Sequence, residues 1–306
     1  MDDAPVPVTV VTGFLGAGKT TLLQQWLGAY ARDEVAVIVN ELGAVGIDAE
    51  MLAERARSIR EITGGCACCT THGELVRALE VFATSVPAPK RIFVETSGAA
   101  SPAGVVRALL REGPAQLDGI VTVVDASRPL PDDALASEQI GYADVVVLSH
   151  VDRSSPESIA EFSTALAARN PTALVAHGEN GALRESSLDE LLARRIELPK
   201  EIASSNHEDA IESLALRLDG EVDDDRFGDW VEQDLARFSG RLLRIKGVLA
   251  VSGLETRMIL QGVTDRLEVT FGAPFGDEPR ACRLVLIGFG LERDVLAASF
   301  AATAAS

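Results

Sequence analysis

The sequence is short of lysine and of positive charge in general. Lysine occupies only four of its 306 positions, and acidic residues outnumber basic residues by 46 to 28, so the formal net charge is −18. Binding to nucleic acid or to an anionic membrane surface depends on clustered lysine and arginine. The charge balance therefore predicts that the partners of this chain include neither nucleic acid nor a membrane.

The features of a secreted or membrane-spanning protein are also lacking. The first seven residues carry two aspartates and no basic residue, unlike a secretory signal. No apolar run reaches the ~18 residues that a membrane span needs. Four unevenly spaced cysteines do not form a disulfide framework. A reducing, cytoplasmic location is the simplest prediction.

What the sequence does contain is a globular composition with an α/β pattern. Apolar residues make up 47% and charged residues 24%, which allows a sizeable core. Short apolar strands alternate with amphipathic helices through the first domain, and this order predicts a mostly parallel sheet. We expect strands at 6–12, 35–40, 58–62, 91–95, 119–125, 143–149 and 172–175, and helices at 19–30, 73–84, 102–111, 156–169 and 187–195.

The pattern changes after residue 198. Residues 199–210 lack periodicity, and we interpret them as a linker between a first domain at 1–198 and a smaller α+β domain at 211–306. In the second domain we expect the order β-α-β-β-β-α, with strands at 214–218, 240–252, 257–271 and 283–288 and helices at 223–238 and 292–302. Arg241, Arg244 and Lys246 are expected to form a partner site or, as we favour, a solvated strand face.

A phosphate-binding loop follows the first strand. Residues 13–20 read GFLGAGKT and match G-x-x-x-x-G-K-[ST] between a strand and a helix. Such a loop, from Gly13 through Ala17, turns backbone N–H groups toward a phosphate. Lys19 can reach the β- and γ-phosphate oxygens, and the Thr20 hydroxyl can bind Mg²⁺. The first domain is therefore predicted to be a P-loop NTPase.

Two further strand ends carry residues suited to the same nucleotide. Glu95, followed by Gly98, has the arrangement of a Walker-B switch: Glu95 holds Mg²⁺ directly or through water, and the Gly98 N–H senses the γ-phosphate. We assign Lys19 and Glu95 to catalysis. Ser149-His-Val-Asp152 lies where GTPases carry [NST]-K-x-D, and Asp152 can accept hydrogen bonds from guanine. At both strand ends, the alternative is that these polar residues simply end a strand and do not bind nucleotide.

Three of the four cysteines gather in one short segment. Cys66, Cys68 and Cys69 lie just ahead of a predicted helix, whose N-terminus favours the thiolate that binds metal. Zn²⁺ or Co²⁺ takes such thiolates together with nitrogen or oxygen ligands. Glu41 and His72 are candidates for the fourth ligand. A redox pair and buried structural thiols are the alternatives.

Four segments of this sequence, GFLGAGKT, NELGAVGID, GGCACC and ETSG in this order, resemble the CobW-type family of P-loop GTPases. Similarity continues in the second half at 241–247, 260–263 and 283–288, so the resemblance spans nearly the whole chain. By position it implies a phosphate site, a thiolate metal site and, at Glu41, a switch segment that joins them. The phosphate site consists of Gly16, Gly18, Lys19, Thr20 and Thr21, and the metal site of Cys66, Cys68 and Cys69.

Three positions depart from the family pattern. Ala44 stands where the family usually has glutamate, His150 replaces the lysine of the base site, and His72 replaces an arginine. The first departure puts an accessory metal ligand in question, and the second puts a strict preference for GTP in question.

The resemblance implies a GTPase metallochaperone that converts GTP and water slowly to GDP and phosphate, with Mg²⁺. It delivers a transition metal of the Zn²⁺ or Co²⁺ class from the CxCC site to a client metalloprotein or cofactor-biosynthesis protein. One alternative is a client-specific activator or scaffold of a metalloenzyme such as nitrile hydratase. Another is a P-loop kinase or ATPase with redox-active thiols. The sequence leaves the metal, the client and the formation of a homodimer open.

Overall fold

A computed structural model describes residues 4–41, 52, 56, 58–63, 70–110, 113–179, 181–184, 186–194, 211–264 and 266–305 of the protein. The chain divides into two compact units, one formed by Met1–Thr164 and Ala173–Arg195 and the other by Ala165–Thr172 and Ile196–Ser306. The linker predicted at 199–210 lies outside the described residues, and the predicted domain boundaries at 198/199 and 210/211 remain a prediction.

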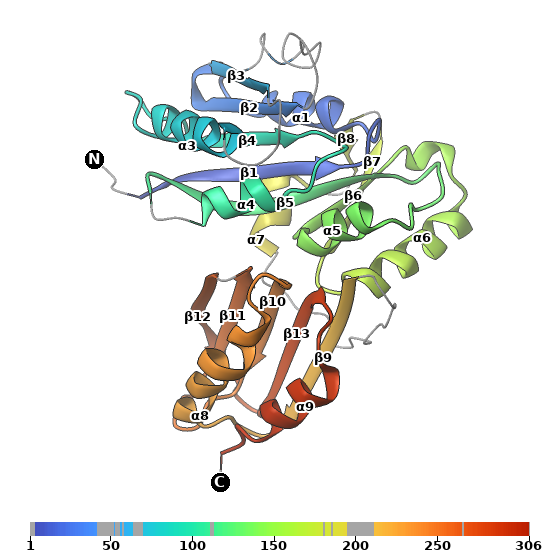
Figure 1. The fold of residues 1–306 in the computed structure, drawn as a ribbon. Helices are drawn as coiled ribbons and strands as arrows, with labels where there is room; N and C mark the ends of the chain where they lie inside the picture. The colour runs from blue at the N-terminus through green and yellow to red at the C-terminus, as the bar shows by residue number, and fades with distance from the viewer. Residues whose placement is uncertain are drawn as a thin grey trace. The chain divides into compact units, whose positions relative to one another are not determined.

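The first unit is built on a sheet of eight strands in the order β3-β2-β4-β1-β5-β6-β7-β8 (Figure 1). The strands from β3 to β7 pair in parallel, and β8 pairs antiparallel with β7. Their bounds are β1 (Val6–Gly13), β2 (Val35–Glu41), β3 (Ser58–Thr63), β4 (Arg91–Thr96), β5 (Ala115–Asp125), β6 (Val145–Ser149), β7 (Leu174–Glu179) and β8 (Ala182–Leu183). The central strands are buried along almost their whole length, as expected for a parallel sheet covered on both faces.

Helices cover this sheet. Among the described residues, the helices of the first unit are α1 (Lys19–Leu27), α3 (Thr70–Ala83), α4 (Ala103–Leu109), α5 (Ala134–Tyr142), α6 (Pro156–Arg169), whose last residues group with the second unit, and α7 (Leu188–Arg194). Side chains of α1 and α7 share one apolar core with the strands, and the rings of Trp26 and Phe93 stack there with centroids 6.4 Å apart. Helices α3, α4 and α5 lie on the opposite face in Figure 1. The predicted α/β class is confirmed.

One helix of this unit, α5, is absent from the sequence prediction. Its residues are buried almost all round, including the polar Ser137 and Gln139, so the segment lacks the apolar stripe that marks an amphipathic helix. The start signal is present nevertheless. The side chain of Asp133 accepts a hydrogen bond from the backbone N–H of Ala136 at 2.8 Å and caps the helix.

The second unit contains an antiparallel sheet of five strands in the order β12-β11-β10-β13-β9. Their bounds are β9 (Ile211–Asp219), β10 (Leu242–Leu249), β11 (Thr256–Val263), β12 (Arg266–Pro274) and β13 (Ala281–Phe289). Helix α8 (Asp224–Asp229) continues as a π turn and then a 3₁₀ turn to Phe238, and α9 (Arg293–Ala301) follows the last strand. The prediction of a smaller C-terminal domain of the α+β class is confirmed.

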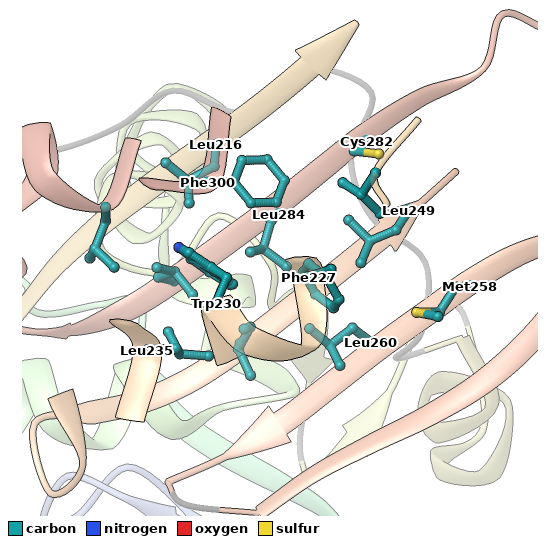
Figure 2. Packing of buried hydrophobic residues seen from close by; sticks show 14 of the residues in the cluster. Leu216, Phe227, Trp230, Leu235, Leu249, Met258, Leu260, Cys282, Leu284 and Phe300 are labelled. Atoms are coloured by element: carbon teal, nitrogen blue, oxygen red, sulfur yellow. The ribbon is translucent and has the colours of Figure 1, made fainter. Parts of the chain in front are cut away.

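The core of this unit gathers around Trp230 (Figure 2). Its indole ring stacks on Phe227 at 5.7 Å and meets the edge of Phe300 at 5.4 Å between centroids. The indole N–H donates to the Ser299 hydroxyl at 2.9 Å, so the polar end of the buried side chain is satisfied.

Two details of the second half differ from the prediction. The single strand expected at 257–271 is a hairpin of β11 and β12, which reverses beside Thr264, a residue with a left-handed φ of 53°. The sequence lacks the Asn-Gly or Asp-Gly signal of a tight hairpin there. The solvated face expected for the basic residues of β10 is also wrong. Arg244 and Lys246 are buried, and Lys246 donates to the backbone carbonyl of Thr172, in the 165–172 part of the same unit, at 3.1 Å.

Candidate nucleotide and metal sites

The predicted phosphate loop joins the end of β1 to the start of α1. Three of its glycines adopt the left-handed region, with φ values of 128° at Gly13, 75° at Gly16 and 91° at Gly18. A Cβ atom at Gly13 would lie 2.1 Å from the backbone oxygen of Val123. Glycine is therefore required there by backbone conformation and by space.

Lys19 opens α1 and points back into this loop. Its ammonium group donates to the backbone carbonyls of Gly13 and Phe14, each at 3.0 Å, and its side chain is buried. Next to it the Thr20 hydroxyl donates to Glu95 Oε1 at 2.8 Å. The structure thus brings together the cation, the hydroxyl and the carboxylate that the sequence analysis selected.

Glu95 stands near the carboxyl end of β4, beside β1 in the sheet, with Val11 as its register partner. The loop after it rests directly on the phosphate loop, because a Cβ atom at Gly98 would lie 2.5 Å from the backbone N of Leu15. A cavity of about 310 Å³ opens between the two loops. It is lined by Leu15, Gly16, Gly18, Lys19, Thr20, Thr21, Glu95, Thr96, Ser97 and Gly98.

This cavity suits a polyphosphate with a hard divalent cation. Glycine N–H groups, a helix N-terminus and an ammonium group attract phosphate oxygens. The Thr20 hydroxyl and the Glu95 carboxylate are oxygen donors, the ligand type that Mg²⁺ prefers. Both groups already point toward each other, so the residues present fit the ion.

A second cavity, also about 310 Å³, adjoins the first, since Gly18 and Thr21 line both. Ser149, His150 and Asp152 reach it from the end of β6, and the remaining lining residues are Leu22, Val123, Val147, Arg153, Gly178 and Gly181. The Ser149 hydroxyl donates to the backbone carbonyl of Ala17 at 2.7 Å, which ties the end of β6 to the phosphate loop. Asp152 is part of a 3₁₀ turn, Val151–Arg153, and keeps its carboxylate partly accessible.

His150 precedes this turn with a φ of 56°, and its ring is held from the neighbouring strand. Nδ1 lies 3.3 Å from Asp125 Oδ1 and 3.1 Å from the Ser149 hydroxyl. Burial disfavours the charge on Asp125, yet the hydrogen bonds from Ser127 and the nearby His150 ring and Arg128 guanidinium outweigh burial. The pKa of Asp125 is therefore below its ordinary value.

Two residues of these sites were not predicted from the sequence. Asp125 ends a strand whose carboxyl edge faces the nucleotide site, a signal of the same kind as those at Glu95 and Ser149. Gln139 is fully buried on the missed helix α5, and its side-chain amide donates to the carbonyls of Gly98 at 3.4 Å and Ala100 at 3.0 Å. It therefore holds the loop that follows Glu95.

The predicted thiolate site falls largely outside the described residues. Cys66, Cys68 and Cys69 belong to the undescribed segment 64–69 between β3 and α3. Glu41 is the last residue of β2 and has Thr63 of β3 as its register partner. Within the described ranges, no group of three or more histidine, cysteine or acidic side chains is arranged to hold a metal ion. The same ranges hold no helix with the length and apolar character of a transmembrane span.

The fold and the phosphate loop define a P-loop nucleotide-binding protein. The chain belongs to the CobW/HypB/UreG family, because the model of that family's nucleotide-binding domain matches residues 7–177, more than half of the chain. The model of the cobalamin synthesis protein cobW C-terminal domain matches residues 211–304. The resemblance inferred from the four sequence segments is thereby confirmed.

Relatives match along nearly the whole chain. The zinc chaperone YjiA of Escherichia coli (strain K12) is 31% identical, with 97% of this chain and 98% of YjiA covered. The zinc chaperone CobW of Pseudomonas aeruginosa is 31% identical, with 96% and 90% covered. The crystal structure of Zn(II)-bound YjiA GTPase from E. coli superposes with a TM-score of 0.71 at 25% identity, covering 99% of this chain and 100% of that one. A Zn(II)-bound triple mutant of the same GTPase, with one glutamate and two cysteines replaced by alanine, superposes with a TM-score of 0.72 at 26% identity and similar coverage.

Proposed function

We propose that this protein is a GTP-hydrolysing metallochaperone that carries Zn²⁺, or a metal of similar ligand preference such as Co²⁺, to a client metalloprotein or cofactor-biosynthesis protein. One contact carries the link between nucleotide and metal: the backbone N–H of Ser97 donates to the carbonyl of Asn40 at 2.9 Å. Ser97 lines the phosphate cavity, and Asn40 immediately precedes the candidate metal ligand Glu41.

GTP is proposed to occupy both cavities. Its phosphates fit the loop from Gly13 to Thr21, and its base fits the cavity beside Ser149 and Asp152. The Asp152 carboxylate would accept from N1–H and the exocyclic amino group of guanine, which adenine does not present in that pattern. The Gly98 N–H would contact the γ-phosphate, so that the loop after β4 responds to hydrolysis.

Hydrolysis rests on positioning and charge. Lys19 would hold the β- and γ-phosphate oxygens, and Thr20 and Glu95 would hold Mg²⁺. The ion, when bound, neutralises charge that develops on the phosphate oxygens. The Glu95 carboxylate is already bonded to Thr20, which suits a role at the ion better than removal of a proton from water. We expect slow turnover by the protein alone, with the client completing the site.

The metal part of the proposal rests on chemistry and on the relatives. Cys66, Cys68 and Cys69, as thiolates in a reducing cytoplasm, would bind the transition metal together with Glu41. The relatives are described as zinc chaperones, which favours Zn²⁺ as the cargo. When GTP orders the loop that contains Ser97, the bond to Asn40 would shift Glu41 and change the metal affinity.

The decisive experiment is a zinc competition titration with and without a non-hydrolysable GTP analogue. We expect the parent protein to bind one Zn²⁺ tightly, with an affinity that changes when the analogue is present. The Cys66/Cys68/Cys69→Ser variant should lose this tight site and still bind the analogue. The single variant Cys282→Ser is the matched control, because Cys282 is a buried thiol of the second unit.

The quantity to compare is the affinity of the tight, nucleotide-dependent zinc site, not the total amount of bound zinc. The YjiA triple mutant that lacks two cysteines is still Zn(II)-bound, so zinc binds that relative in the absence of those two thiols. Unchanged tight binding in the triple serine variant would refute the thiolate site. A parent affinity that is indifferent to the analogue would refute the coupling.

A further inference from the structure

The loop after β4 is fastened to helix α5 through two of its backbone carbonyls. The side-chain nitrogen of Gln139 donates to the carbonyl of Ala100 at 3.0 Å and to the carbonyl of Gly98 at 3.4 Å. Because both acceptors are oxygen atoms, the nitrogen end of the amide faces the loop and the oxygen end does not. The neighbouring Glu138 accepts a hydrogen bond from the Ser101 hydroxyl at 2.8 Å, so two consecutive residues of α5 hold this loop.

The oxygen end of the Gln139 amide contributes nothing to this attachment. The side chain is fully buried, and its Oε1 atom has no hydrogen-bond partner among the residues that the structure describes. A buried acceptor without a partner is unfavourable, so a methionine of similar length would fill the same space without this penalty. Packing alone therefore does not account for glutamine here, whereas the donor that it offers to the loop does.

The helix presents this amide from a fixed position. The backbone carbonyl of Gln139 accepts a hydrogen bond from the Thr122 hydroxyl of β5 at 2.7 Å. The Asp133 side chain caps the start of α5, and most residues of the helix are buried. Movement of the loop after β4 relative to this helix must therefore stretch or break the bonds from Gln139.

The two carbonyls that Gln139 binds belong to the loop proposed to contact the γ-phosphate. Gly98 lines the phosphate cavity, and as a glycine it allows its peptide groups to turn over more easily than other residues do. A carbonyl oxygen turned into the cavity would bring partial negative charge toward the phosphate oxygens and repel them. With both carbonyls held by α5, the loop can offer N–H groups to the cavity instead.

We propose that Gln139 is a positioning residue that favours the binding of GTP over the binding of GDP. Its amide holds the carbonyls of Gly98 and Ala100 at α5, which leaves the Gly98 N–H oriented for the γ-phosphate. The inference rests on the proposed function, in which that N–H contacts the γ-phosphate, and it adds the residue that orients the contact. GDP has no γ-phosphate, so the binding of GDP should not depend on Gln139.

The size of the effect follows from the fraction of molecules in which the loop is correctly oriented. A nucleotide that requires one orientation binds with an apparent affinity that is reduced in proportion to this fraction. Loss of the two bonds from Gln139, one of them long, should lower the fraction about tenfold, which is equivalent to about 1.4 kcal/mol.

The test compares the affinity for a non-hydrolysable GTP analogue with the affinity for GDP, measured with the full-length protein and Mg²⁺. Gln139→Met keeps the approximate volume of the side chain and removes the donor. We expect this variant to bind the analogue about tenfold more weakly and GDP within about twofold of the parent. Gln139→Glu keeps the shape but turns a charged oxygen toward the two carbonyls, so its loss of affinity for the analogue should be larger. The melting temperature of Gln139→Met should stay close to that of the parent, because the buried acceptor is removed together with the donor.

Glu138→Gln is the matched control on the adjacent residue of α5. The side-chain oxygen of a glutamine can still accept from Ser101, so we expect parent-like affinities for both nucleotides. Gln139→Asn is a second substitution at the site itself, which keeps the amide but withdraws it from the loop by one methylene group. It should weaken binding of the analogue and spare GDP, and it decides the question even if the methionine variant does not fold.

The outcomes separate this inference from the proposed function. A ratio of analogue affinity to GDP affinity equal to that of the parent, in both Gln139→Met and Gln139→Asn, would overturn the inference alone. An equal loss of affinity for both nucleotides would assign Gln139 to the general stability of the loop and would also overturn it. A parent that binds neither nucleotide would overturn the proposed function and the inference with it.

Discussion

The loop after β4 rests so closely on the phosphate loop that one added methyl group should disturb both. In Gly98→Ala, the new Cβ would lie 2.5 Å from the N atom and 2.6 Å from the Cα atom of Leu15. Ordinary contact begins at 3.4 Å, so one loop must retreat by 3.4 − 2.5, or about 0.9 Å. These neighbours are backbone atoms, which cannot rotate away as the end of a side chain does.

A displacement of about 1 Å at a phosphate site can lower a reaction rate about 100-fold, and overpacking costs about 1–3 kcal/mol of folding free energy. We therefore expect GTP hydrolysis by Gly98→Ala to fall by about two orders of magnitude, with a melting temperature lower by several degrees. Single-turnover hydrolysis and thermal denaturation measure the two effects separately.

Gly104→Ala is the matched control. Gly104 lies in α4 near the same loop in sequence, and a Cβ atom there would meet nothing within 4 Å. Alanine in a helix is favoured over glycine by up to about 1 kcal/mol, so this variant should hydrolyse GTP normally and be slightly more stable. Parent-like hydrolysis and melting in Gly98→Ala would show that the two loops do not touch as described.

Other predictions address separate parts of the molecule. Lys19→Ala removes the ammonium group held at the loop carbonyls and should weaken GTP binding at least about 100-fold. An unchanged affinity for GTP would refute the assignment of residues 13–20 as the phosphate-binding loop. Asp152→Asn should reduce the preference for GTP over ATP by about 10- to 100-fold, measured by competition between the two nucleotides, and an unaltered ratio would refute guanine recognition there. Trp230→Ala should lower the free energy of unfolding of the second unit by about 3–5 kcal/mol in denaturant titrations while GTP binding persists; a smaller loss would mean the ring is not central to that core. Because the pKa of Asp125 is lowered in the fold, its stabilising effect is present above the unfolded pKa and lost as pH falls through the folded value. Asp125→Asn should therefore reduce the acid sensitivity of melting below about pH 4, and an identical pH profile would contradict this.

The sequence predicted best those features that depend on a few consecutive residues. The phosphate loop is such a feature, since the glycines needed for its positive φ values and the lysine that opens the helix lie within eight positions. The central strands of the first unit were predicted for a similar reason, because burial on both faces gives each of them a nearly continuous apolar run, whereas the two-residue β8 was not predicted.

Features that depend on distant partners were missed. Asp125 gains its role only because β5 and β6 are neighbours, which brings its carboxylate within 3.3 Å of His150. Gln139 is polar and fully buried, and the carbonyls that accept from its side-chain amide lie about 40 positions earlier in the chain. Lys246 was expected in solvent for the same reason, since alternation along a strand does not say what covers either face.

The size of the nucleotide–metal coupling can be bounded from the contact proposed to carry it. A net backbone hydrogen bond is worth about 1 kcal/mol, so the bond from Ser97 to Asn40 alone would change metal affinity about fivefold. Register pairing of Asn40 with Thr96 also joins β2 to β4 in the same sheet. A measured coupling near fivefold would fit transmission through this single bond. A factor of 100 or more would require further contacts between the nucleotide and the thiolates, and Ser97 would then be one of several connections instead of the principal one.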